Sequence, residues 1–106
     1  AEIRKVLQWI ESNLGEEETR VEKLAQLVDL SPSHLHRQFK EQTGLPPSDY
    51  MLRRRIMEAQ RLLTTNSASV TDIAMQLGFS SSQYFATAFR RYTLVSPSAW
   101  RDTALG

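Results

Sequence analysis

The chain contains no cysteine, and that absence excludes several kinds of site. Without a thiol it can form no disulfide, no thiolate-bound zinc or iron–sulfur centre and no cysteine nucleophile. No apolar run approaches the roughly 18–20 residues of a membrane span, and no signal-peptide pattern opens the chain. We therefore expect a cytoplasmic protein without a membrane partner. Because the chain begins at Ala1 rather than Met, we expect it to be a fragment of a longer protein.

Residue patterns of common catalytic sites are missing as well. The sequence holds no Gly-x-Ser-x-Gly, no glycine-rich phosphate loop, no His-Glu-x-x-His and no clustered carboxylate pair. The two histidines, His34 and His36, would point about 200° apart on a helix and could not chelate one metal ion. We expect no enzymatic activity, no cofactor and no metal.

The formal net charge is only +1, but its distribution is uneven. Residues 1–30 hold four basic against seven acidic side chains, whereas residues 31–106 hold nine against five. A basic bias over the last two-thirds suits a nucleic-acid partner, although surface charge also varies this much by chance.

The apolar residues recur at helical spacing, and strand signals are nearly absent. We predict an all-α fold of about seven helices. Gly15 is expected to end the first helix as its left-handed C′ residue, and the sixth helix contains Tyr84, Phe85, Ala88 and Phe89. The predicted helix starts lie at Thr19 with Glu22, Ser31-Pro32, Pro46-Pro47, Ser69 with Asp72, one of Ser80, Ser81 and Ser82, and Ser96-Pro97.

An internal repeat relates the second and third predicted helices to the fifth and sixth, with an offset of 49 residues before the turn and 50 after it. The turn needs a residue that tolerates positive φ, a role we assign to Asp29 and Gly78. Each copy has the pattern of a helix-turn-helix unit, whose second helix enters a DNA major groove. The matching residues are Ala25, Leu30, Leu35 and Phe39 in the first copy and Ala74, Phe79, Phe85 and Phe89 in the second.

A long linker helix is predicted between the two units. We divide the chain into residues 1–46, with the first helix and first unit, residues 47–65, the linker, and residues 66–106, with the second unit and last helix. The linker would span about 28 Å, close to the roughly 34 Å between successive major grooves on one face of DNA. Its apolar residues Ile56, Ala59, Leu62 and Leu63 are expected to pack against both units and fix their separation.

A further set of residues occurs in order and at fixed spacing along nearly the whole chain. They are residues 31–40 with Thr43-Gly44, then Tyr50, Arg55-Ile56, Ala59 and Leu62-Leu63, and then Ile73-Ala74, Leu77-Gly78-Phe79, Tyr84-Phe85, Phe89-Arg90-Arg91, Ser96-Pro97 and Arg101. With these residues the chain resembles the DNA-binding domain of the AraC/XylS family of bacterial transcription regulators. It departs from the family at Leu94, where glycine is usual, at Trp100, where tyrosine is usual, and at Thr87, where many members carry arginine or lysine.

The resemblance implies a transcription regulator, usually an activator, that binds asymmetric promoter DNA. An activator must also contact RNA polymerase, so we expect RNA polymerase as a partner. In most members an effector-binding or dimerisation domain precedes this one, so we expect this domain to be monomeric and leave a dimeric parent chain open. The resemblance also places Arg55 at a position that we expect to be structural, with Asp72 as its partner.

The outward faces of the third and sixth predicted helices carry the candidate DNA contacts. Arg37 suits a bidentate contact to guanine, Gln83 suits one to adenine, and Ala86 and Thr87 suit a thymine methyl group. The candidates for base reading are Ser33, His36, Arg37, Lys40, Ser82, Gln83, Ala86 and Thr87. The candidates for phosphate contact are Ser31, Ser81, Arg90 and Arg91.

Two alternatives compete with this interpretation. Each candidate could be ordinary solvated surface, and the two units could form a helical module that binds another protein. A protein-binding module would carry large apolar residues on the outward faces, where this sequence has mostly serine, histidine, arginine, glutamine and threonine.

Overall fold

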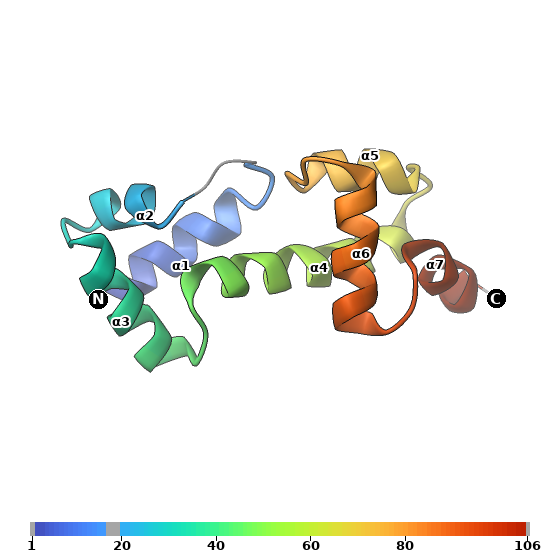
Figure 1. The fold of residues 1–106 in the computed structure, drawn as a ribbon. Helices are drawn as coiled ribbons and strands as arrows, with labels where there is room; N and C mark the ends of the chain where they lie inside the picture. The colour runs from blue at the N-terminus through green and yellow to red at the C-terminus, as the bar shows by residue number, and fades with distance from the viewer. Residues whose placement is uncertain (1, 17–19, 106) are drawn as a thin grey trace.

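Seven α-helices form the regular secondary structure of residues 2–16 and 20–105, which this computed structural model describes apart from the side chain of Leu105. They are α1 (Glu2–Ser12), α2 (Val21–Leu27), α3 (Pro32–Thr43), α4 (Pro47–Thr65), α5 (Val70–Gln76), α6 (Ser82–Thr93) and α7 (Pro97–Leu105). The molecule is 46 Å long and 21 Å across, with α1–α3 at one end of α4 and α5–α7 at the other (Figure 1). The predicted all-α fold with a long linker helix is confirmed. None of the described helices is long and apolar enough to cross a membrane.

Serine side chains cap the starts of four helices. Each serine hydroxyl accepts a hydrogen bond from the backbone N–H three residues later, which satisfies a donor that has no partner inside the helix. The caps are Ser31 on α3, Ser69 on α5, Ser81 on α6 and Ser96 on α7, with distances of 3.2, 3.0, 3.0 and 3.1 Å. Among the three serines considered for α6, the structure selects Ser81. The cap predicted at Thr19 lies outside the described residues.

The two helix-turn-helix turns close in the same way. The N–H of Leu30 donates to the carbonyl of Ala25, and the N–H of Phe79 donates to the carbonyl of Ala74, both at 3.1 Å. This six-residue closure requires a left-handed residue just before the donor. Asp29 (φ +57°) and Gly78 (φ +81°) supply it, so the assignment of positive φ to these positions is confirmed.

The repeat extends beyond the two predicted helices of each unit. Phe39 of α3 contacts Tyr50 of α4 edge to face, with 5.3 Å between ring centroids. Phe89 of α6 makes the same kind of contact with Trp100 of α7, at 6.1 Å. The start of α4 therefore packs against α3 in the same way as α7 packs against α6, so each unit includes a third helix.

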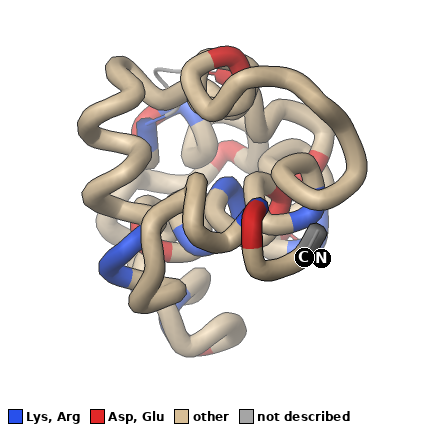
Figure 2. Tube along the Cα trace, turned by 90° about the vertical axis from the view of Figure 1, so that its right-hand side faces the viewer, with Lys and Arg blue, Asp and Glu red and all other residues tan. Residues whose placement is uncertain are grey.

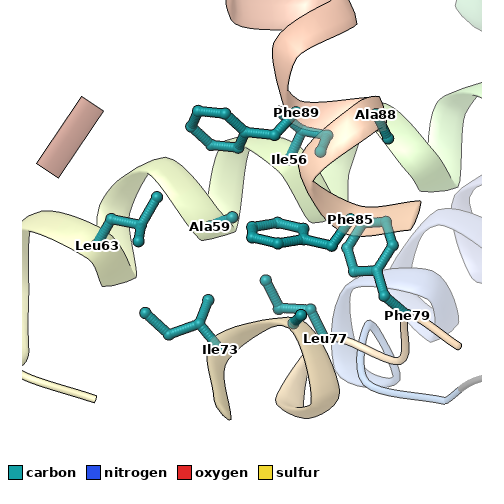
Figure 3. Packing of buried hydrophobic residues seen from close by; sticks show 10 residues of the cluster. Ile56, Ala59, Leu63, Ile73, Leu77, Phe79, Phe85, Ala88 and Phe89 are labelled. Carbon is teal, nitrogen blue, oxygen red and sulfur yellow. The ribbon is translucent and has the colours of Figure 1, made fainter. Parts of the chain in front are cut away.

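Two separate hydrophobic cores lie at the two ends of α4. The first contains Ile3, Val6, Ile10, Leu24, Ala25, Leu35, Phe39 and Met51. The second contains Ile56, Ala59, Leu63, Ile73, Ala74, Leu77, Phe79, Phe85, Ala88 and Phe89 (Figure 3).

The division of α4 between these cores corrects one prediction. Ile56, Ala59 and Leu63 are buried in the second core, and Leu62 packs against that core alone. They do not pack against both units, because each helical turn advances about 5.4 Å and only the first turns of α4 reach the first core. That core receives Met51 from α4 instead.

The loop after α1 corrects two further predictions. Gly15 does not have the left-handed conformation expected of a C′ residue, since only Gly44 and Gly78 have positive φ among the described glycines. Arg55 does not pair with Asp72: its Nε donates to the carbonyl of Leu14 at 2.9 Å, and its Nη2 donates to the carbonyl of Glu16 at 2.6 Å. These carbonyls lie past the end of α1 and need donors, whereas Asp72 lies exposed in the first turn of α5. Burial lowers the pKa of the Arg55 guanidinium, because desolvation disfavours the cation.

Candidate nucleic-acid interface

Helices α3 and α6 lie at opposite ends of α4, and both run across its direction (Figure 1). Each buries one apolar face completely, through Leu35 and Phe39 in α3 and through Phe85 and Phe89 in α6. The opposite face of each helix is left to solvent. The sequence predicted this geometry: two corresponding helices of the repeat, each with one outward face, are held apart by a helix about 28 Å long.

On α3, all four candidate base-reading residues are exposed. Ser33, His36, Arg37 and Lys40 form one outward stripe, and no hydrogen bond or ion pair to another described side chain engages them. Beside the stripe, the ring of His34 bonds to the amide of Gln38 at 2.8 Å. The stripe is therefore available to a partner.

On α6, the candidates divide. Ser82, Gln83 and Thr87 are exposed, but Ala86 is half-buried and offers less surface than the sequence suggested. The Thr87 hydroxyl donates to the carbonyl of Gln83 at 3.0 Å, so its hydrogen is used within the helix and its lone pairs can only accept. Gln83 is left with the full donor and acceptor capacity of its amide.

The candidate phosphate contacts lie at helix ends. Ser31 and Ser81 are exposed caps at the N-termini of α3 and α6, where the helix dipole favours an anion. Arg90 and Arg91 are exposed in the last turn of α6. In Figure 2 the basic positions of α6 lie at an edge of the molecule, and that helix carries no acidic residue.

The basic residues of the last two-thirds of the chain fall into two groups. Five are engaged within the molecule: Arg53 over the ring of Tyr92, Arg54 with Glu11, Arg61 with Glu58, and Arg55 and Arg101 with backbone carbonyls. Four have no partner among the described residues, and they are Arg37, Lys40, Arg90 and Arg91. All four belong to α3 and α6. Within residues 31–106, the cations without a partner among the described residues therefore all lie on the two helices that expose a polar face.

Tyr84 is a candidate that the sequence analysis missed by grouping it with the apolar residues of α6. Its side chain is 49% exposed and only edges against Phe79, with 5.7 Å between ring centroids. It lies next to Gln83 in the first turn of α6. The internal repeat could have identified it, because its counterpart in α3 is the polar His34. No cluster of three or more potential metal-ligating side chains occurs within the described part of the chain.

Comparison with known proteins identifies relatives along most of the chain. A family model described as a helix-turn-helix domain matches residues 24–103. The transcriptional activator RhaS of Escherichia coli strain SE11 is 46% identical over 92 residues, which cover 87% of this chain and 33% of RhaS. The chain therefore spans about a third of the length of the curated relatives it matches.

Solved structures share the fold. The DNA-binding domain of AdpA, described as a global transcriptional factor and solved with a target DNA, is 34% identical with a TM-score of 0.91, covering 95% of this chain and 90% of that one. The C-terminal domain of the response regulator AraT from Geobacillus stearothermophilus is 27% identical with a TM-score of 0.93, covering 96% and 84%. The C-terminal domain of the response regulator YesN from Fusobacterium nucleatum is 32% identical with a TM-score of 0.88, covering 92% and 95%.

Proposed function

This chain belongs to the AraC/XylS family of DNA-binding domains of transcription regulators, and on that premise we propose that α3 and α6 occupy adjacent major grooves on one face of double-stranded DNA. The observation that carries the proposal is the location of the uncommitted cations. Arg37, Lys40, Arg90 and Arg91 all lie on these two helices, while the remaining arginines of residues 31–106 are engaged by other groups of the molecule. The length of the molecule, 46 Å, exceeds the roughly 34 Å that separates successive grooves.

Within this arrangement the candidate side chains divide into two roles. Ser33, His36, Arg37 and Lys40 on α3, and Ser82, Gln83, Ala86 and Thr87 on α6, read base edges, as stripes of polar groups at the starts and middles of recognition helices do. Ser31, Ser81, Arg90 and Arg91 contact phosphates and fix the register of each helix on the duplex.

We extend the proposal from DNA binding to the regulation of transcription. Since RhaS is a transcriptional activator, we propose that the whole protein activates transcription in the cytoplasm and contacts RNA polymerase. The domain binds DNA as a monomer, because it carries two reading helices of its own.

Selection of bound duplexes from a random pool tests the proposal. We expect two conserved half-sites whose centres lie about 10 base pairs apart, with unrelated sequences because the two reading stripes differ. A double substitution, Arg37→Ala with Lys40→Ala, should abolish selection of one half-site. The matched control, Arg4→Ala with Lys5→Ala, removes the same charge from exposed positions of α1 and should leave both half-sites unchanged. Recovery of a single half-site would contradict the two-groove arrangement, and recovery of no consensus would favour a protein-binding module.

A further inference from the structure

The two cores are joined by α4 and, independently, by a contact between two turns. The loop after α1 belongs with the first core, since α1 buries its apolar face there. This loop meets the turn between α5 and α6, which belongs with the second core (Figure 1). We call this contact, formed by Gly15, Gln76 and Gly78 and supported by Arg55 of α4, the junction.

The backbones approach so closely at the junction that neither glycine leaves room for a side chain. A Cβ at Gly15 would lie 2.6 Å from the carbonyl oxygen of Gln76. A Cβ at Gly78 would lie 2.9 Å from the carbonyl oxygen of Gly15. Both opposing atoms are backbone, so a clash could be relieved only by moving one turn away from the other.

Arg55 holds the loop in place from α4. Its guanidinium bonds to the carbonyls of Leu14 and Glu16, one on each side of Gly15, at 2.9 and 2.6 Å. The neighbouring Arg54 pairs with Glu11 near the end of α1. The loop is therefore fixed between α4 on one side and the turn of the second unit on the other.

These contacts give the two units a second point of attachment. Without the junction, the first core would hold α4 mainly through Met51 and Tyr50 in its first turns, and bending or rotation there would swing the second unit as a whole. We propose that the junction sets the orientation of α6 relative to α3, which makes Gly15 and Arg55 positioning residues for the spacing between the two DNA half-sites. The half-site part of this inference rests on the proposed function.

A fixed orientation has a measurable consequence for DNA. Each inserted base pair rotates one half-site by about 34° relative to the other. If the two units have one fixed relative orientation, the domain binds tightly to DNA with one half-site spacing. If the units are flexibly connected, the domain binds DNA with several spacings, each at lower affinity.

The orientation can be measured without DNA. Because the chain has no cysteine, Gln42→Cys on α3 and Asp102→Cys on α7 provide unique, exposed positions for spin labels. We expect a single narrow distance distribution in the parent protein and a shifted or broadened one after Gly15→Ala or Arg55→Met. If both substitutions leave the distribution unchanged in proteins that circular dichroism shows to be folded, the proposal is wrong.

Two matched controls separate orientation from stability. Gly44→Ala places a side chain at φ +85° with nothing within 4 Å of its Cβ, so it strains the backbone without touching the junction. Arg61→Met removes an exposed arginine of α4 whose partner is Glu58 on the same helix. Both controls should keep the parent distance distribution, even where Gly44→Ala lowers the melting temperature. A change of distribution in the controls equal to that of Gly15→Ala would overturn the proposal.

Binding to the selected duplex completes the test. The parent protein should prefer the selected spacing over one that is longer by one base pair by roughly tenfold or more, and Gly15→Ala should reduce that preference to about twofold or less. Affinity for either half-site alone should not change. If the parent protein bound no duplex, the proposed function would fail, while the spin-label distances would still decide whether the junction sets the orientation.

Discussion

Gly44 and Leu94 occupy the same position in the two repeats, and both are left-handed, with φ of +85° and +71°. Each ends the second helix of its unit and donates its N–H to a carbonyl four residues earlier, at 2.8 Å. Glycine adopts this conformation freely, whereas leucine places its Cβ against the backbone at a cost of about 1–2 kcal/mol.

Leu94→Gly should therefore stabilise the domain. The Leu94 side chain is 82% exposed, so its removal forfeits little packing. Part of the relieved strain is offset by the greater freedom of glycine in the unfolded chain, and we expect a net gain of about 0.5–1 kcal/mol in the free energy of unfolding. Urea denaturation of both proteins measures it. A loss of stability would show that the leucine makes a compensating contact.

Asp29→Gly should have a smaller effect of the same sign. Aspartate tolerates the left-handed region better than leucine, and Asp29 has a φ of +57°. We expect a change between neutral and an upper limit of about 1 kcal/mol of stabilisation, and in a direct comparison a smaller gain than that of Leu94→Gly. Thermal melts of the two variants together would rank them. The reverse order would mean that Asp29 carries more strain than Leu94.

The periodic and local features of this fold were predictable from sequence. Helix starts at Ser31, Ser69 and Ser96 follow from serine followed by proline or an acidic residue, because a cap is a bond over three residues of one chain. The left-handed turn residues follow from the repeat, since Gly78 identifies the role of Asp29.

Contacts between distant segments were not predictable in the same way. Nothing in the composition of residues 14–16 indicates that their carbonyls receive the guanidinium of Arg55, a contact that spans about 40 positions of the chain. The sequence suggested that Gly15 ends a helix. Glycine is required there because the backbone approaches the carbonyl of Gln76, and this approach exists only in the folded molecule. The sorting of arginines into engaged and uncommitted groups depends on such contacts, so the sequence alone could not show that Arg53 and Arg54 are engaged.

Glu11→Gln should destabilise the domain only above acidic pH. Hydrogen bonding to Arg54 lowers the pKa of the Glu11 carboxyl in the folded protein, so the pair contributes stability when the carboxyl is ionised in both states. That contribution is lost as the pH falls through the lowered folded pKa. Because Glu11 is about half exposed, we expect roughly 0.5 kcal/mol at pH 7.

Denaturation curves of the parent and Glu11→Gln proteins from pH 7 to pH 3 check this sign. The two should converge in the acidic range, and 1 M salt should reduce their difference at pH 7. A difference that persists at pH 3 would assign the effect to packing rather than to charge.

Removal of an arginine that contacts a phosphate should lower the affinity for every DNA sequence to the same extent. Arg91→Ala is expected to weaken binding evenly across duplexes and to reduce the slope of log affinity against log salt by about 1. Titrations on the selected duplex and on an unrelated one at several salt concentrations measure both effects. A loss confined to the selected duplex would place Arg91 at a base instead.

Removal of a base-reading side chain should have the opposite signature. Arg37→Ala and Gln83→Ala should each weaken binding to the selected duplex by about 1–3 kcal/mol and relax the preference at one or two base pairs, with little change in the salt slope for Gln83→Ala because its amide carries no charge. Since the two residues lie on α3 and α6, at opposite ends of α4, the relaxed positions should be about one helical turn apart. Repeating the selection with each variant reveals those positions directly. If both substitutions relaxed the preference at the same base pair, α3 and α6 would have to bind the same groove, and the two-groove arrangement would be wrong. The 46 Å length of the molecule argues against a shared groove, because the two helices lie at its opposite ends.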